Sequence, residues 1–328
     1  MQAEDVLQRL QSAALVLDES ERGKVEVFGP EAALFLHNLS TADVKGMPVG
    51  AGSEAFFGNA RARAVAWGNI YHVLLSQGRD AFWIDLPAGE SSTLMGHLDR
   101  HLISEQAEFA DKTDGFGQFH LFGTGARKSL EALVGEPIPD LEPWQHMERT
   151  LGGRVIAHIR RRDALGFAGY DLVFQAKHHE FVRGLLLAEG LEFVIPAEVV
   201  DWARIAAGLP AWGPEIGPET FISEVGRNRF AVSSTKGCYL GQEPIVMARD
   251  RGQIGKRLTL LALSGHPGKL PVVLKQGDKE AGFLTSFSVH PSRGIIGLGY
   301  VRRNWWNVGE KLIAGEVEAT CVGPATPD

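Results

Sequence analysis

The residue types best suited to chemistry are gathered in one octet, Lys236-Gly237-Cys238-Tyr239-Leu240-Gly241-Gln242-Glu243. Glycines flank the thiol of Cys238, so a ligand can approach the backbone closely and neighbouring side chains shield the sulfur poorly. Lys236 lies two residues away, and a nearby cation favours the thiolate form of a cysteine. We therefore predict Cys238 as the reactive residue and Lys236 as the group that tunes it.

The second half of the octet is suited to holding a heterocycle. Gln242 offers a donor and an acceptor, and Glu243 offers a carboxylate for the N–H edge of a ring such as a pterin. We predict that Gly237, Tyr239 and Gly241 complete the ligand-binding set. These residue types suit a polar ring better than a metal ion, so no metal site is predicted.

A local basic strip follows the octet and consists of Arg249, Arg251, Lys256 and Arg257. Such a strip can receive a carboxylate tail or a phosphate, and we include Arg249 and Arg251 among the predicted ligand-binding residues. The plainer alternative is that the thiol of Cys238 is a small buried apolar group, that the tyrosine beside it belongs to the core, and that the strip is a solvated face.

Composition narrows the class of protein. At roughly 150 residues per domain, a chain of 328 residues should hold two to three domains, and its 44% hydrophobic and 22% charged content excludes a disordered chain. A net charge of −7 argues against nonspecific adhesion to nucleic acid or to anionic membranes. Two cysteines cannot build a disulfide framework or a cysteine-based metal cage, which favours a reducing compartment.

The chain shows no sign of a membrane or secretory segment. No stretch approaches the roughly 18 uninterrupted apolar residues of a membrane span. The first 20 residues carry charges where a secretory signal needs an apolar centre, so they are expected to form a surface helix. We expect a soluble cytoplasmic protein without a membrane partner.

The elements that must position the octet begin with repeated strand–glycine–helix units. Residues 24–28 alternate like a half-buried strand and precede a helix opened by Gly29. Residues 119–122 precede Gly123 and a second helix, for which Thr124 is the candidate cap. Aligning the two units also matches apolar positions in their helices, which suggests related halves.

Further elements follow from the same patterns. A third unit runs from a strand over 170–174 into a helix near 178–189, and another helix follows Pro196. Residues 55–86 are typical of consecutive strands, followed by a helix capped by Ser91 or Ser92. The turns between those strands are predicted at 58–59, 67–69 and 77–79.

The C-terminal part differs in pattern. Residues 209–234 predict a long ordered loop, and loops of that length in compact proteins are usually functional. From about residue 256 onward, alternating runs separated by glycines predict a small all-β domain. The predicted division is therefore 1–254 and 255–328, within an α+β fold.

The octet resembles the signature of the YgfZ-type folate-binding proteins, which are relatives of the glycine-cleavage T-protein, an aminomethyltransferase. Residues 38–44, 204–210 and 282–300 resemble other stretches of that family, so the resemblance extends over most of the chain. It implies a three-lobed ring of two α+β lobes and a C-terminal β-barrel around a central folate pocket. The implied cofactor is tetrahydrofolate or a derivative.

The chain also departs from the transferase pattern. The T-protein has an acidic residue, implicated in its transfer chemistry, just after a GN-containing turn, whereas residues 59–67 of this chain hold no carboxylate. Ala206 replaces the transferase's pterin-binding glutamate, as is usual in the YgfZ-type branch. Met247 stands where the family has an arginine, and Arg249 or Arg251 are the candidate substitutes. These departures leave open whether the chain is an enzyme.

Three functions compete. The favoured one is a tetrahydrofolate-binding accessory protein that acts through Cys238, which the resemblance links to iron–sulfur protein assembly or repair and to one-carbon metabolism. Its partners would be folate and iron–sulfur client proteins, because one cysteine cannot hold a cluster alone. The alternatives are a folate-dependent aminomethyl or methyl transferase or demethylase, and a noncatalytic RNA- or protein-binding module.

Other constellations have plainer interpretations. His178-His179-Glu180 is interpreted as a helix start, since adjacent histidines on a helix point in different directions. Arg160-Arg161-Arg162 is interpreted as a solvated hairpin end. Arg302 and Arg303 with Trp305-Trp306 are interpreted as barrel-edge packing, although this mixture can also stack a base. The sequence contains no Walker loop, dinucleotide fingerprint or nucleophile elbow.

Overall fold

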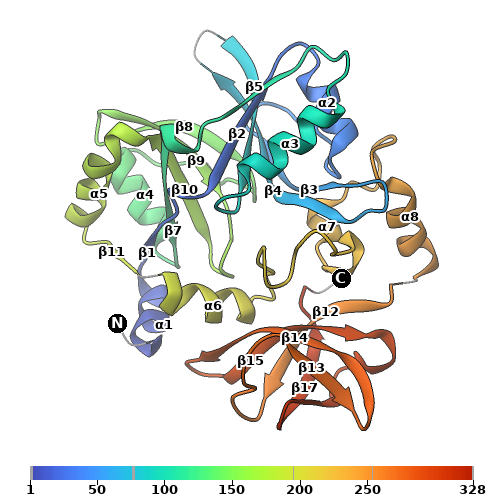
Figure 1. Ribbon diagram of the computed structural model, residues 1–328. Coiled ribbons are helices and arrows are strands. Elements are labelled where there is room, and N and C mark those ends of the chain that lie inside the picture. Colours follow the sequence, from blue (N-terminus) through green and yellow to red (C-terminus); the bar gives the residue numbers. More distant parts are fainter. Residues whose placement is uncertain (1–2, 76–77, 195, 253, 327–328) are drawn as a thin grey trace.

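The computed structural model describes residues 3–75, 78–194, 196–252 and 254–326. It has three lobes: two α+β lobes, each built on an open sheet, and a closed β-barrel at the C-terminal end (Figure 1). The predicted α+β fold with a small all-β tail is therefore confirmed. None of the helices in the described ranges is long and apolar enough to cross a membrane.

The first lobe is a five-stranded sheet covered on one face by helices α2 (Ala32–Leu39) and α3 (Ser91–His101). Leu36 and Leu98 on these helices are fully buried against the sheet, as their apolar spacing requires. The strands, in spatial order, are β3 (Gly52–Gly58), β4 (Ala64–Leu75), β5 (Arg79–Leu86), β2 (Gly23–Phe28) and β6 (Glu108–Asp111).

The second lobe is a six-stranded sheet covered by α4 (Ala126–Val134) and α5 (His179–Ala188), the latter being the predicted helix near 178–189. Helices α1 (Ala3–Ser12) and α6 (Pro196–Ala206) pack at the end of this lobe, and α6 is the predicted helix that follows Pro196. The strands, in spatial order, are β11 (Glu192–Phe193), β1 (Leu15–Asp18), β7 (Phe116–Phe122), β10 (Gly169–Gln175), β9 (Val155–Arg161) and β8 (His146–Leu151). Because β1 comes from the N-terminal end, this lobe combines chain segments that are not consecutive.

The third lobe is the barrel, whose first strand begins at Lys256. Side chains such as Leu261, Leu274 and Leu312 fill its interior and are fully buried. The strands, in spatial order, are β12 (Lys256–Leu263), β15 (Gly294–Arg302), β14 (Lys279–His290), β13 (Val272–Gln276), β16 (Lys311–Ala314) and β17 (Val317–Pro324). The division of the chain into 1–254 and 255–328 stays a prediction.

The segment between α6 and the barrel is ordered by buried contacts rather than by long helices. The carboxylate of Glu215 accepts hydrogen bonds from Arg204 at 3.0 Å and from Thr285 of the barrel at 2.7 Å. This shared anion ties α6, the long segment and the barrel together. The short helices of the segment are η4 (Ile222–Glu224), α7 (Asn228–Ala231) and α8 (Gln242–Arg251).

The two α+β lobes share an unusual turn geometry. Gly29 and Gly123 have φ angles of 122° and 118°. A Cβ atom at these positions would lie 2.5 Å from the carbonyl oxygen of Gln106 and 2.6 Å from that of Ala13, respectively. Only glycine tolerates both the angle and the close approach. This common geometry supports the prediction that the two lobes are related halves.

The predicted caps are wrong. The residue that precedes α4 is Gly125 rather than Thr124, and no side chain caps the helix. Ser91 is the first residue of α3, whose N-cap position is occupied by Glu90. At the start of α4, the backbone N–H groups of Thr124 and Gly125 donate to the carbonyls of Leu10 and Ala13, so this turn is held without a capping side chain.

The predicted turn at 67–69 is also wrong. Strand β4 runs through these residues without interruption. Gly68 is required in mid-strand because a Cβ atom there would lie 2.3 Å from the carbonyl oxygen of Asp85. The predicted turn at 77–79 begins in residues outside the described ranges.

The faces of the two open sheets that carry no helices pack against each other. Tyr71 and Trp83 of the first lobe contact Val173 of the second, and all are buried. Lys24 and Glu26 are only 2% and 4% exposed, so the strand predicted as half-buried is buried on both faces. The reason is that its polar face meets another sheet instead of solvent.

We expect the Gly68→Ala variant to lower the free energy of unfolding by about 2 kcal/mol, the cost typical of overpacking. The reason is that the added Cβ clashes with the carbonyl oxygen of Asp85, and strand β4 must shift to relieve the clash. Chemical denaturation measures the change. Gly96→Ala is the control, because a Cβ there meets nothing within 4 Å and alanine favours the interior of α3. Equal stability of both variants would contradict the steric role of Gly68.

Candidate functional site

The octet lies between α7 and the first turn of α8, against the first lobe. It packs on residues 38–44, the second stretch that carries the family resemblance. The backbone N–H of Leu240 donates to the carbonyl of Asn38 at 2.9 Å, and that of Ser233 donates to Thr41 at 2.9 Å. Two segments about two hundred positions apart therefore form one structural unit.

Lys236 is the buried anchor of this unit. Its ammonium donates to the carbonyl oxygens of His37, Ser40 and Ala42, at 2.8 Å and 2.7 Å for the last two. These carbonyls lie at and beyond the C-terminal end of α2, where a cation is favoured. Burial lowers the pKa of Lys236 to about 7, opposed by the negative charge of Asp43. The donors of Lys236 are thus directed at the backbone of 37–42.

The residues after the thiol are anchored as well. Tyr239 is buried in an apolar cluster with Phe56 and Ile222, as the core interpretation expected. Leu240 packs against the core of the first lobe. Gly241 has a φ of 80°, and a Cβ there would lie 2.5 Å from the carbonyl oxygen of Asn59. The octet is therefore fitted closely onto the turn that begins at Asn59.

The two cysteines lie in opposite environments. Cys238 is exposed, so the interpretation of this thiol as a small buried group is wrong. Cys321 is buried in the barrel, where burial raises the pKa of its thiol to about 11. Between the anchors Lys236 and Tyr239, the backbone therefore presents one accessible sulfur.

The polar residues of the octet begin α8. Glu243 is exposed, and no described residue forms a hydrogen bond or an ion pair with its carboxylate. Gln242 is half-buried and donates its backbone N–H to the carbonyl of Tyr239. Met247, which stands at the position of the family's arginine, is exposed on the same helix. Both polar side chains are thus accessible from solvent.

The basic strip does not form one surface. Arg249 is exposed and pairs with Asp250, while the side chain of Arg251 lies outside the described residues. Lys256 lies over the rings of Phe283 and Tyr300 on the barrel. The remaining member, Arg257, stacks on Trp306 and donates to its carbonyl. The two barrel cations thus serve packing, and Trp305 and Trp306 pack against the barrel core as expected.

A hollow of about 310 Å³ lies beside the octet, between residues 42–53 and residues 229–233. Asp43, Arg229, Phe230 and Ser233 line it, and Ser233 is also the residue whose hydroxyl oxygen accepts the N–H of Lys236. None of the described octet residues lines this hollow. It offers an aromatic face, a carboxylate and a cation in one concave surface.

Sequence reasoning missed a buried acid near the turn that lacks a carboxylate. Glu54 of β3 is 3% exposed and forms an ion pair with the guanidinium of Arg227. The indole N–H of Trp67 donates to the same carboxylate at 2.8 Å. The carboxylate of Glu54 is thus already paired with a buried cation. Its only signal in the sequence is a charged residue before an apolar strand, which is too common to be diagnostic.

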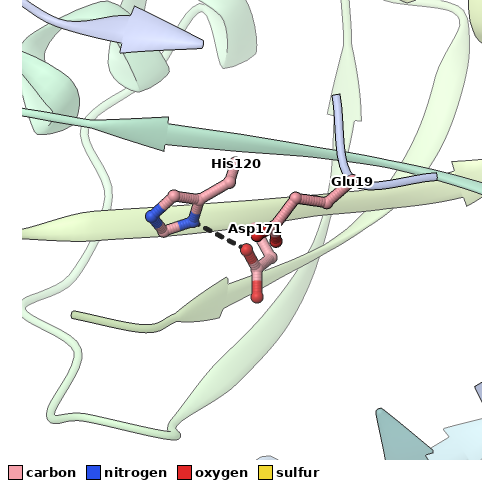
Figure 2. Close-up of side chains that lie close together, drawn as sticks. All are labelled: Glu19, His120 and Asp171. Carbon is pink, nitrogen blue, oxygen red and sulfur yellow. Dashed lines mark hydrogen bonds and ion pairs between the residues drawn. The ribbon is translucent and has the colours of Figure 1, made fainter. Parts of the chain in front are cut away.

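Figure 2 shows another group that sequence reasoning missed, Glu19, His120 and Asp171, whose polar atoms lie within 4.8 Å of one another. Nδ1 of His120 lies 2.8 Å from a carboxylate oxygen of Asp171. The guanidinium of Arg162 forms ion pairs with both carboxylates. Burial raises the pKa of Asp171, but the charge and hydrogen bonds of Arg162 together with those of His120 outweigh it and hold that pKa well below its usual range. Arg162 therefore takes the place that a metal ion would need.

The arginine run 160–162 is not a solvated hairpin end. Arg160 is 1% exposed, and its guanidinium carbon lies 4.3 Å from the ring centroid of Tyr71 and 5.4 Å from that of Trp83. The reason is the packing of the two sheets, which buries the polar face of β9. His179 opens α5 as predicted and pairs with Asp18 instead of a metal.

We expect the Lys236→Met variant to lose roughly 2–4 kcal/mol of unfolding free energy, because buried carbonyls lose their donors. The loss should be larger at pH 9 than at pH 7. Between pH 7 and the ordinary lysine pKa of 10.5, the unfolded chain binds more protons at this group than the folded chain does. The free energy of unfolding of the native protein therefore rises with pH over this range, and the variant lacks this increase. Denaturation at both pH values measures this.

The control for this variant is Lys45→Met, which changes an exposed lysine nearby and should alter stability by less than about 0.5 kcal/mol. A loss in the Lys236→Met variant that is no larger than the control's would contradict the anchoring role.

We expect a water-soluble maleimide to modify Cys238 rapidly in the folded protein and Cys321 only after unfolding. Exposure governs the first rate, whereas burial and the raised pKa suppress the second. Mass spectrometry of the intact protein counts the adducts. Cys238→Ser should abolish the fast adduct. Two fast adducts, or none, would argue against the described environments.

Comparison with known proteins places this geometry in a family. A family model described as the GCVT N-terminal domain matches residues 2–236. The chain is 27% identical over 299 residues to an aminomethyltransferase of Rubrobacter xylanophilus, covering 89% of this chain and 77% of that protein. It is 26% identical over 322 residues to an Arabidopsis thaliana protein named provisionally as a chloroplastic transferase. This match covers 95% of this chain and 71% of that protein.

A solved structure has the same fold. The glycine cleavage system aminomethyltransferase T from Bartonella henselae superposes with a TM-score of 0.85 at 20% identity, covering 98% of this chain and 88% of that one. The fold match extends through the barrel, beyond the stretch that the family model covers. The chain therefore belongs to the family defined by the GCVT N-terminal domain, with the aminomethyltransferase-like fold of two α+β lobes and a C-terminal β-barrel.

Proposed function

We propose that this protein is a tetrahydrofolate-binding accessory protein of the YgfZ type, which serves iron–sulfur protein assembly or repair through Cys238. The observation that carries the proposal is the exposed thiol between two buried anchors, Lys236 and Tyr239. A thiol held in this way is accessible to a partner while its backbone stays fixed. Structural cysteines are usually buried, as Cys321 is.

The carboxylates of the first lobe favour an accessory role over aminomethyl transfer. The turn from Asn59 holds no acid, and the buried acid close to it, Glu54, is paired with Arg227 and Trp67. Arg227 and Trp67 occupy this carboxylate, so it is not free to bind a substrate amine.

The folate is assigned to the hollow beside the octet. Phe230 can stack on a pterin, and Asp43 can accept from its N–H edge. Arg229 can pair with the carboxylate tail. A hollow of about 310 Å³ is at the small end of ligand sites. In this arrangement the accessible side chains of Gln242 and Glu243 at the start of α8 are left for a partner protein that contacts the thiol, and the predicted ligand-binding roles of Arg249 and Arg251 stay predictions.

The iron–sulfur part of the proposal needs a partner. Within the described residues, the one group of three metal-ligating side chains contains no cysteine and is neutralised by Arg162. A cluster needs more ligands than Cys238 alone supplies. Any cluster contact would therefore be shared with the client protein.

A folate-dependent one-carbon transferase is the second candidate. It is favoured by the similarity, at 22–27% identity over most of the chain, to proteins named aminomethyltransferases. The two candidates share the folate and differ in whether Cys238 is needed.

We expect tetrahydrofolate to bind with a micromolar dissociation constant in isothermal titration calorimetry. Asp43→Asn and Phe230→Ala should each weaken binding at least tenfold, because each removes a contact to the ring. The matched control Asp114→Asn, at an exposed acid outside the hollow, should bind as the native protein does. No heat of binding at high micromolar folate would refute the folate assignment.

The role of the thiol is tested in cells that lack this protein. The native chain and Cys321→Ala should restore the activity of iron–sulfur enzymes, whereas Cys238→Ala should not. Folate binding by Cys238→Ala should be intact. If instead Cys238→Ala restores the cells and purified protein turns over a methylated or aminomethylated amine with folate, the second candidate replaces the first.

A further inference from the structure

The layer between the two open sheets contains a buried cation that is not paired with an acid. Arg160 of β9 is 1% exposed, and all three nitrogens of its guanidinium lack a hydrogen-bond partner among the described residues. The ion pairs in the described part of the chain involve its neighbours Arg161 and Arg162 but not Arg160. Because an arginine does not lose its proton in proteins, its charge when buried requires a counter-charge close by.

The groups next to Arg160 in its own sheet do not supply that counter-charge. Asp171 lies directly opposite Arg160 on β10, but its carboxylate is engaged by His120 (Figure 2) and by the guanidinium of Arg162. His146 lies opposite Arg160 on β8, where burial and the charge of Arg160 lower its pKa to about 4. At neutral pH this imidazole is therefore uncharged.

The facing sheet of the first lobe covers Arg160 with aromatic rings. The guanidinium carbon lies 4.3 Å from the centroid of the Tyr71 ring and 5.4 Å from that of Trp83. Asp85 on the same sheet forms its ion pair with Arg22. The rings stabilise the cation through its flat face, but the N–H groups in the plane of the guanidinium need an acceptor at its edge.

The hydroxyl of Tyr71 is a second donor in this layer. Tyr71 is fully buried, and its oxygen has no hydrogen-bond partner among the described residues. Burial, reinforced by the negative charge of Asp171, raises the pKa of Tyr71, so the phenol keeps its proton. Buried donors are almost always satisfied in proteins. Two donor groups, one from each lobe, thus need an acceptor in the same layer.

The position suits a small anion. Arg160 and Tyr71 are enclosed by the packed sheets, and neither lines the hollow beside the octet. Water accepts hydrogen bonds but does not balance a charge. We propose that a chloride ion binds between the two sheets, held by the guanidinium of Arg160 from the second lobe and the hydroxyl of Tyr71 from the first. Because each lobe supplies a donor, the bound ion joins the lobes and stabilises their docking.

The chloride dependence of stability tests this site in the full-length protein. In urea denaturation at constant ionic strength, replacing sodium gluconate by up to about 200 mM sodium chloride should lower the unfolding equilibrium constant at least tenfold. The effect should saturate, because the ion binds only the folded chain. Arg160→Met should remove this dependence. Arg154→Met is the matched control, since it changes an exposed arginine that also lies over a ring, that of Phe181, and it should keep the full dependence.

A crystal structure of the native protein locates the ion. Bromide has the same charge as chloride and a similar radius, so crystals grown in sodium bromide should show an anomalous peak in contact with Arg160 and the Tyr71 oxygen. This measurement decides the question even if Arg160→Met does not fold. The proposal is overturned by the absence of a peak at Arg160, by equal stability of the native protein in chloride and gluconate, or by an unchanged chloride effect in Arg160→Met.

Discussion

The structure depends on one interaction, the packing of two polar sheet faces against each other. Each α+β lobe buries one face under its helices in the usual way. The second faces carry charged and aromatic side chains that contact each other across the interface. The guanidinium of Arg160 in the second lobe lies over the rings of Tyr71 and Trp83 in the first lobe, and the indole N–H of Trp144 donates to Asn69. Any other docking of the lobes would leave these buried polar groups without their partners.

This interface also fixes the position of the octet relative to helix α6. The first lobe carries residues 38–44, on which the octet rests, and the second lobe carries α6, which holds the barrel through Glu215. The thiol and the hollow beside it are therefore fixed relative to the barrel through a chain of buried polar contacts. Cys238 lies at the end of that series of contacts: its backbone is fixed by the neighbouring anchors, and its sulfur is exposed.

Much of the fold follows from local sequence patterns. Strand–glycine–helix units and an alternating C-terminal tail are set by periodicity and turn residues, and these appear as predicted. The octet also indicates Cys238 as a reactive residue and Lys236 as the group that tunes it; the thiol is exposed, and both roles stay predictions. The errors share one cause: Gly68 was interpreted as a turn and Arg160 as solvated because each is determined by a distant strand or sheet that no local window contains.

The same limit explains the residues that were missed. Glu54, Arg162 and Tyr71 are ordinary in sequence and become notable only through burial and through the partners they have or lack. Lys236 shows the converse: its place in the octet suggests chemistry, whereas its ammonium donates to backbone carbonyls. Motif membership therefore selects candidate residues, but only the contacts in the fold show what each side chain touches.

The anchoring of Lys236 has a consequence for the order of folding. The hydrogen bond from Lys236 to the carbonyl of Ala42 closes a loop of 194 positions. The carbonyls at and beyond the C-terminal end of α2 in the first lobe therefore gain this donor only when a residue far along the chain is present. Closing so long a loop is entropically costly and slow. All strands of the two open sheets precede Lys236 in the chain, so this contact can form only after the residues of both sheets have been synthesised.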